Sequence, residues 1–140
     1  MKKSSFTFSK EINITPEQAW KIIGAVNGVD KWVGPITACS VDGDKRVCAT
    51  EEGSFEEDIL KIDHENRVFK YGIPKQHMVP VSNIIGQMSV TNGTNNQAIV
   101  TWTWNFDVTE ENEAVAKETF NMLGSMGIDG IEQLVLTEAA

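Results

Sequence analysis

The chain has 140 residues, with 12 basic and 20 acidic side chains and a formal net charge of −8. This length suits one domain with a substantial core, so we expect a single domain over residues 1–140. No basic cluster offsets the acidic charge, so nucleic acid and anionic membranes are poor partners. No apolar run approaches the ~20 residues of a membrane span, and residues 1–5 lead into an alternating pattern instead of an apolar signal core. We therefore expect a soluble, cytoplasmic protein without membrane insertion.

The beginning of the chain predicts one strand followed by two short helical segments. Apolar side chains alternate with polar ones at Phe6, Phe8, Ile12 and Ile14. Thr15 followed by Pro16 is typical of a helix start, with threonine as the N-cap and proline at the first helical position. This helix fades near residues 27–28, and a second helical turn is expected over residues 29–32.

Six further strands follow in rapid succession. We expect them over residues 36–41, 46–51, 54–62, 68–73, 81–91 and 97–106. They are separated by turns rich in Gly, Asn and Asp and by one longer loop over residues 74–80. The short connections predict a meander of antiparallel hairpins.

The last strand and the segment after it have contrasting periods. Large apolar side chains share one face of the strand, at Val100, Trp102, Trp104 and Phe106. Residues 111–136 have a helical period, with one stripe formed by Ala116, Phe120, Leu123, Gly127, Ile131 and Leu134. Gly124, Gly127 and Gly130 interrupt this helix, each at a cost of roughly 1 kcal/mol relative to alanine. Rings opposite a helix with gaps predict a hollow between helix and sheet.

This order of elements and four local motifs resemble the helix-grip fold of the SRPBCC superfamily. That superfamily includes START lipid-transfer domains, plant abscisic-acid receptors and bacterial polyketide cyclase-like proteins, and the similarity is strongest to the polyketide cyclase and dehydratase-like branch. The motifs are residues 16–20 with Trp32, residues 57–63, residues 71–73 with 79–83, and residues 100–102 with Phe106. The resemblance implies an α+β fold, with about seven antiparallel strands curved around a long C-terminal helix and two short helices between strands one and two.

The chain departs from these relatives at three positions. Asp58 replaces the arginine that follows the glutamate of the branch, and Ile84 replaces an aromatic residue. Thr37 stands where the abscisic-acid receptors have the lysine that pairs with the carboxylate of their ligand. An acidic ligand therefore loses its obvious anchor.

Glu57 is the main candidate for chemistry. It shares strand parity with Phe55 and Ile59, whereas Leu60 and Ile62 have the opposite parity, so either one set faces outward or a bulge intervenes. If Glu57 faces an apolar cavity, desolvation raises its pKa, no adjacent cation offsets the shift, and the group can transfer a proton near neutral pH. The alternative is a solvated member of the acidic run over residues 56–58.

Tyr71, the only tyrosine, shares strand parity with Phe69 and Ile73. Its hydroxyl would orient a ligand in an apolar cavity, or it is a core tyrosine whose hydroxyl reaches a backbone group. Glu57 and Tyr71 are the catalytic candidates if the protein is an enzyme.

The wider set of candidate ligand-binding residues combines the aromatic faces with the resemblance. It consists of Trp32, Thr37, Phe55, Glu57, Ile59, Phe69, Tyr71, His77, Met88, Trp102, Trp104, Phe120, Leu123 and Gly127. The alternative for the aromatic stripe is an ordinary core. His77 lies in the loop that matches a ligand-closing loop of the receptors, although a surface histidine is the simpler interpretation. We expect residues 74–80 and 29–32 to form the rim of the entrance.

Cys39 and Cys48 flank a turn over residues 42–45. A tight turn centred on Asp42 and Gly43 would leave the two cysteines out of register, whereas a longer loop would align them. We expect two reduced thiols, because no export signal is present. Neither histidine stands at zinc-ligand spacing from them, so we expect no metal site, and no motif implies a cofactor.

The resulting hypothesis is a protein that binds a small hydrophobic molecule of lipid, polyketide or aromatic type in an internal cavity, as a monomer or homodimer. One alternative is an enzyme resembling polyketide cyclases, dehydratases or isomerases, with Glu57 as acid–base. Another is a co-chaperone-like interaction module, which would use an outward apolar patch instead of a cavity.

Overall fold

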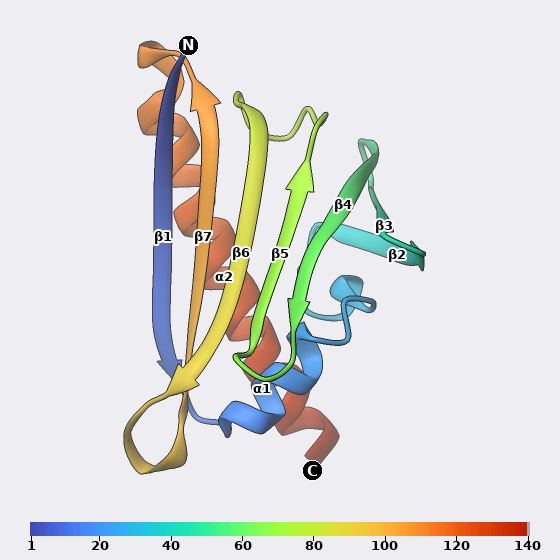
Figure 1. Ribbon diagram of the computed structural model, residues 1–140, viewed down its shortest axis with the longest axis vertical. Helices are drawn as coiled ribbons and strands as arrows, with labels where there is room; N and C mark the ends of the chain where they lie inside the picture. The colour runs from blue at the N-terminus through green and yellow to red at the C-terminus, as the bar shows by residue number, and fades with distance from the viewer. Residues whose placement is uncertain (140) are drawn as a thin grey trace.

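A seven-stranded antiparallel sheet curves around a long C-terminal helix in the computed structural model, which describes residues 1–139 (Figure 1). The strands are β1 (Lys2–Ile12), β2 (Ile36–Asp42), β3 (Lys45–Thr50), β4 (Gly53–Asp63), β5 (Val68–Ile73), β6 (Ser82–Asn92) and β7 (Ala98–Val108). They lie in the order β1-β7-β6-β5-β4-β3-β2, so that only β1 leaves the chain order. The predicted α+β helix-grip architecture is confirmed.

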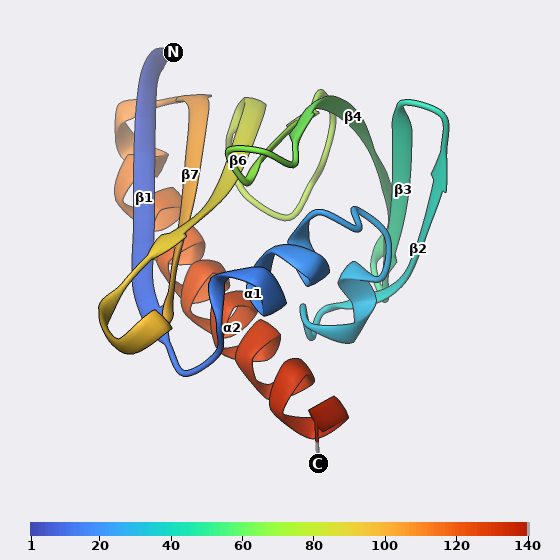
Figure 2. The same cartoon turned by 60° about the horizontal axis from the view of Figure 1, so that its bottom comes forward.

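Two α-helices and three short 3₁₀-helices complete the fold of the described residues 1–139. They are α1 (Pro16–Ile23), α2 (Glu113–Ala139), η1 (Val29–Lys31), η2 (Thr94–Asn96) and η3 (Glu110–Asn112). In Figure 2, α2 runs across one face of the sheet, and α1 lies beside it in the connection from β1 to β2, the opposite edge strand. None of these helices is long and apolar enough to cross a membrane.

Helix α1 begins where the sequence predicts. The Thr15 hydroxyl accepts a hydrogen bond from the Gln18 backbone N–H at 3.1 Å, and the Gln18 side chain accepts one from the Thr15 N–H at 2.9 Å. This reciprocal capping box satisfies two of the N–H groups that a helix N-terminus leaves without partners. The Thr15–Pro16 signal was therefore sufficient to fix the start of α1.

The inner face of β7 packs on α2 through stacked rings. The centroids of Trp102 and Trp104 are 4.5 Å apart, and those of Trp104 and Phe120 are 4.9 Å apart. Val100, Trp102, Trp104 and Phe106 are all buried. The predicted apolar face of this strand is confirmed.

The glycines of α2 do not leave gaps, contrary to the expectation from the sequence. A Cβ atom at Gly127 would lie 2.8 Å from a ring carbon of Trp102, and one at Gly124 would lie 2.8 Å from Cβ of Phe8. These positions let the helix approach the rings of β1 and β7 more closely than a larger residue would permit. The glycines therefore mark places where helix and sheet are in close contact.

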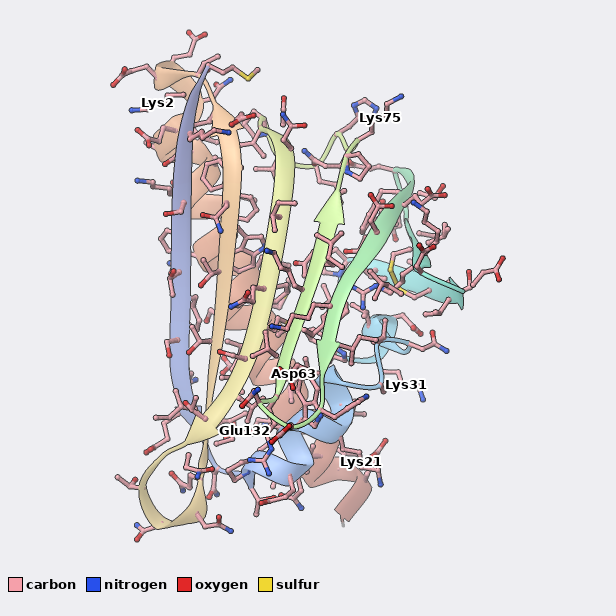
Figure 3. All side chains as sticks on the ribbon, in the orientation of Figure 1. Lys2, Lys21, Lys31, Asp63, Lys75 and Glu132 are labelled. Atoms are coloured by element: carbon pink, nitrogen blue, oxygen red, sulfur yellow. A yellow bond between two sulfur atoms is a disulfide. The ribbon has the colours of Figure 1, made fainter. Side chains whose placement is uncertain are left out.

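Strand β4 accommodates its two sets of apolar residues, which alternate on opposite faces in the sequence, through a register shift. Its pairing with β5 shifts register between Ile59 and Lys61, and Leu60 and Ile62 are 49% and 40% exposed. Because the shift follows Glu57, the carboxylate keeps the inward parity and is 4% exposed. Figure 3 shows Lys31 on η1 and Lys75 in the loop after β5 pointing away from the body of the protein.

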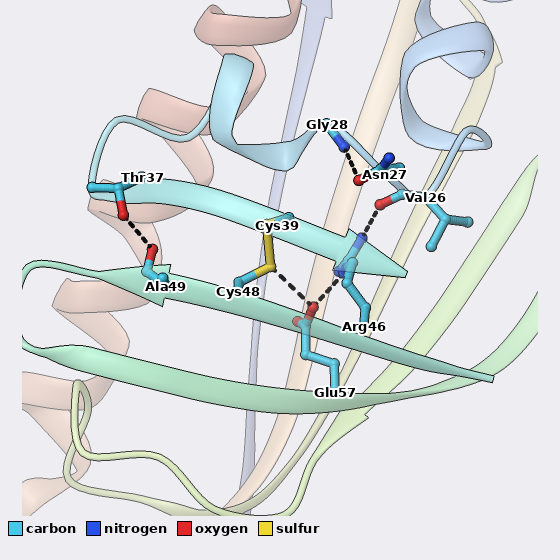
Figure 4. Close-up of a disulfide and its surroundings, with 9 residues drawn as sticks. All are labelled: Val26, Asn27, Gly28, Thr37, Cys39, Arg46, Cys48, Ala49 and Glu57. Atoms are coloured by element: carbon cyan, nitrogen blue, oxygen red, sulfur yellow. Dashed lines mark hydrogen bonds and ion pairs between the residues drawn. A yellow bond between two sulfur atoms is a disulfide. The ribbon is translucent and has the colours of Figure 1, made fainter. Parts of the chain in front are cut away.

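A disulfide joins Cys39 on β2 to Cys48 on β3 (Figure 4). The hairpin pairs Asp42 with Lys45, so its turn is centred on Gly43 and Asp44 and the cysteines are directly opposite, with Cα atoms 4.2 Å apart. The expectation of two reduced thiols is wrong, because the turn lies one residue later than an Asp-Gly turn. The cytoplasmic location expected from the sequence stays a prediction, and disulfides persist mainly in oxidising compartments.

The N-terminus of α2 is tied to β1 through Glu113. Its carboxylate lies 2.8 Å from Lys2 Nζ and accepts a hydrogen bond from the Ser4 hydroxyl at 2.6 Å. These hydrogen bonds, the one from Lys2 first, lower the pKa of Glu113 from 4.5 to about 2. Glu113 therefore connects the first strand to the last helix as a carboxylate.

Reduction of the disulfide should destabilise the protein by about 2–3 kcal/mol, because a cross-link over a short loop removes conformational freedom from the unfolded chain. Urea unfolding with and without dithiothreitol measures this difference. The Cys39→Ser/Cys48→Ser variant should match the reduced protein and ignore the reductant. Identical midpoints for oxidised and reduced protein would contradict the expectation.

Glu113 should make stability depend on acid pH. Its pKa is lower in the folded than in the unfolded chain, so its stabilisation is present above pH 4.5 and is lost as the pH falls to about 2. Glu113→Gln should therefore flatten the fall of the unfolding midpoint over this range. The exposed neighbour Glu111 supplies the control, since Glu111→Gln should keep the wild-type slope. Equal slopes for all three proteins would show that Glu113 has no such role.

Candidate functional site

A pocket of about 610 Å³ lies between α2 and the half of the sheet that ends in β2. Its lining comes from strands β2 to β7, from α2, and from the segments after α1 and β5. Ligand pockets typically enclose ~300–1,000 Å³. The pocket is therefore large enough for a small molecule.

Most of the residues proposed from the sequence come together around this pocket. Those that line it are Trp32, Thr37, Phe55, Glu57, Phe69, Tyr71, Met88, Trp102, Trp104, Phe120 and Leu123. Three others do not line it. Gly127 packs directly against the Trp102 ring, and Ile59 is half-buried beside the register shift of β4. The His77 side chain is exposed.

Two loops and α2 border the pocket. Val29 and Trp32 line it from the segment expected at the rim, and Met78 and Val79 line it from the loop over residues 74–80. Gln76 holds that loop in place, because its amide accepts from the backbone N–H groups of Met78 and Val79 and donates to the Val79 carbonyl. Sequence reasoning missed this role of Gln76, since only the folded loop places its amide among backbone groups.

The mouth of the pocket is unusually rich in methionine. Met78, Met122 and Met126 line it and are 43%, 64% and 41% exposed. Methionine side chains are flexible and polarisable, so they adapt to apolar molecules of different shapes. The border of the pocket is therefore deformable, whereas the stacked rings at its base are not.

A buried ion pair forms the polar centre of the pocket. Arg46 on β3 and Glu57 on β4 are direct cross-strand partners, are 5% and 4% exposed, and join through Arg46 Nε and Glu57 Oε1 (Figure 4). Arg46 also donates through Nη1 to the Val26 carbonyl at 2.6 Å. The Cys48 sulfur lies 3.9 Å from the same Glu57 oxygen. The disulfide thus borders the ion pair.

The expectation that no cation lies beside Glu57 is wrong. Asp58 does replace the arginine found in the relatives, but Arg46 supplies a guanidinium from the neighbouring strand. The signal was present in the sequence, because a turn over residues 50–53 places Arg46 opposite Glu57. Using it would have required the register of this hairpin, which the pattern of residues alone left open.

Aromatic rings surround the guanidinium and connect it to Tyr71. The Arg46 Cζ atom lies 5.1 Å from the Phe69 centroid and 5.5 Å from the Tyr71 centroid, within the range of cation–π attraction. The Trp102 indole N–H donates to the Tyr71 hydroxyl oxygen at 3.0 Å. Tyr71 therefore hydrogen-bonds a side chain, and the backbone partner considered from the sequence is not used.

The chemistry of this centre follows from its charges. Burial raises the pKa of the Tyr71 hydroxyl above its ordinary value of 10.0, and the negative charge of Glu57 raises it further, so the hydroxyl stays protonated. Arg46 Nε donates to one Glu57 oxygen, so the two side chains form a fixed polar centre. This centre can orient or polarise an oxygen atom of a bound molecule. Among residues 1–139, no group of three His, Cys, Asp or Glu side chains could hold a metal ion.

A long helix gripped by an antiparallel sheet, with a pocket between them, defines the helix-grip class of α+β proteins. Within it, the chain belongs to the family described as polyketide cyclase / dehydrase and lipid transport, which matches residues 3–134. The SRPBCC-type resemblance noted in the sequence is thereby confirmed. No curated protein sequence matches the chain significantly.

Several solved structures are similar over nearly the whole chain. The protein XoxI from Bacillus cereus is 27% identical with a TM-score of 0.86, covering 98% of this chain and 99% of its own. An uncharacterized protein from Bacillus thuringiensis is 25% identical with a TM-score of 0.85, covering 95% and 99%. A Thermobifida fusca protein, at 16% identity and a TM-score of 0.81 over 94% and 92%, shares the fold.

Removing either member of the ion pair should destabilise the fold by about 3–5 kcal/mol, because the remaining charge is buried without a partner. This applies to Arg46→Met and to Glu57→Leu. The double variant should lose much less than the sum of the two, since no unpaired charge remains. Urea unfolding of the three variants measures the coupling.

The neighbouring pair Lys45–Asp58 joins the same two strands at the surface and is the matched control. Replacing both of its members in the same way should leave stability almost unchanged, because water screens exposed ion pairs. Additive losses in the Arg46 and Glu57 variants would contradict the inferred coupling.

Proposed function

We propose that the protein binds a small, mainly apolar molecule in the pocket between α2 and the sheet. The observation that carries this proposal is a pocket of about 610 Å³ whose mainly aromatic and aliphatic lining includes the polar centre formed by Arg46, Glu57 and Tyr71. Such a composition suits a ligand that gains affinity from apolar burial and orientation from a few polar contacts. The family, described by cyclase, dehydrase and lipid-transport activities, is consistent with a hydrophobic ligand.

The ion pair favours binding over acid–base catalysis by Glu57. One oxygen of this carboxylate already accepts from Arg46. Catalysis by Glu57 would require that oxygen to be released, or the second oxygen to reach a substrate.

The arrangement of exposed apolar residues also favours a ligand over a protein partner. Met122 and Met126 border the pocket, whereas Leu60 lies at the register shift of β4 and does not line it. An interaction module would be expected to gather its large apolar side chains in one outward patch. Here the exposed methionines are more simply explained as the border of the binding pocket.

Filling the pocket should weaken binding without unfolding the protein. Leu123 lines the pocket and is half-buried, so the larger side chain of Leu123→Trp should weaken binding of the neutral dye Nile red by about tenfold or more. Dye fluorescence measures binding, and circular dichroism measures folding.

Leu136→Trp is the matched control, because Leu136 lies on the same helix, is exposed and does not line the pocket. It should bind the dye as the wild type does. If Leu123→Trp retains wild-type affinity, the dye binds elsewhere and the proposed site is wrong. If the wild type takes up no apolar dye, the proposed function itself is refuted.

A further inference from the structure

Tyr71 carries a hydrogen-bond donor that the protein does not use. Its side chain is 4% exposed and lines the pocket. The hydroxyl oxygen accepts from the Trp102 indole, yet the hydroxyl proton is donated to no residue of the described chain. Because a buried donor without an acceptor is costly, a molecule that supplies an acceptor at this point gains affinity.

The ion pair beside Tyr71 has no net charge that could attract a charged ligand. Arg46 is balanced by Glu57, held by the Val26 carbonyl and packed over two rings. Within residues 1–139, no hydrogen bond involves the second Nη atom of Arg46 or the second oxygen of Glu57. The pair therefore keeps unused N–H donors and one acceptor oxygen, but a charged ligand would have to compete with the existing partner.

The approach to the pocket disfavours anions as well. Glu51 and Glu52 line it from the turn between β3 and β4 and are exposed. The chain as a whole carries a net charge of −8. A carboxylate would approach against this field and would then lie beside Glu57 in an apolar environment.

We infer that the ligand is an uncharged molecule with a hydrogen-bond-accepting oxygen, such as a ketone or ester carbonyl, that receives the Tyr71 hydroxyl proton as a hydrogen bond. Its apolar part occupies the space between the sheet rings and the methionines of α2. Carboxylic acids, which share the apolar part but are ionised at neutral pH, are rejected. This inference rests on the proposed function and specifies the chemical class of its ligand.

Three probes of nearly equal shape separate polarity from charge. These are 2-acetylnaphthalene, its hydrocarbon isostere 2-isopropenylnaphthalene, and naphthalene-2-carboxylate. Their affinities are measured at about pH 7, where a carboxylate is ionised, by displacement of Nile red. The ketone should bind about three- to tenfold more tightly than the hydrocarbon, the range expected for one net hydrogen bond, and the carboxylate should bind most weakly.

Variants test whether Tyr71 is the donor. Tyr71→Phe should reduce the ketone-to-hydrocarbon affinity ratio by about threefold or more, since it removes the hydroxyl. Leu136→Trp, which lies outside the pocket, keeps the hydroxyl and should retain the preference for the ketone. Comparing the ratio within each variant cancels changes in pocket shape that affect both probes. The ranking of the three probes by the wild type tests the inference even if a variant fails to fold.

The possible failures are distinguishable. Equal affinities for the three probes, or tightest binding of the carboxylate, would overturn the inferred ligand class while leaving the pocket as a binding site. An unchanged ketone preference in folded Tyr71→Phe would overturn the role of Tyr71. Absence of both dye and probe binding in the wild type would refute the proposed function together with this inference.

Discussion

The contact between Arg46 and Glu57 holds together parts of the chain that local structure does not connect. The guanidinium reaches a carboxylate on β4, a carbonyl after α1 and the rings of β5 at the same time. A buried charge is tolerated only while its partners remain in place, so this pair constrains the relative positions of all three segments. The polar end of the pocket is consequently a fixed feature of the fold.

The rest of the core divides into a dense part and a hollow part. Gly124 and Gly127 let α2 close onto Phe8 and Trp102, so the side of β1 and β7 is tightly packed. On the other side, β2 to β5 carry the sheet around the helix and the pocket opens between them. A single helix thus packs closely at one end of the sheet and encloses space toward the other, where flexible methionines border it.

The similarity to solved structures supports the fold more strongly than the chemistry. Relatives at 25–27% identity share the architecture over nearly the whole chain. Helix-grip proteins can hold different ligands because the sheet and helix provide the enclosure, whereas individual side chains within it determine the chemistry. In this chain Arg46, Glu57 and Tyr71 contact one another and form a polar centre without net charge in a mainly apolar pocket.

The sequence by itself determined what depends on neighbours along the chain. The Thr15–Pro16 start of α1, the inward face of β7 and the succession of hairpins follow from capping chemistry and side-chain period. Only the tertiary structure decided the features that depend on register between strands. A turn displaced by one residue aligned Cys39 with Cys48, a shift in β4 left Glu57 inward, and hairpin pairing placed Arg46 opposite it. A one-residue slip in register changes every cross-strand partner without altering the pattern of residues along each strand. These contacts can therefore be identified only from the paired strands of the folded sheet.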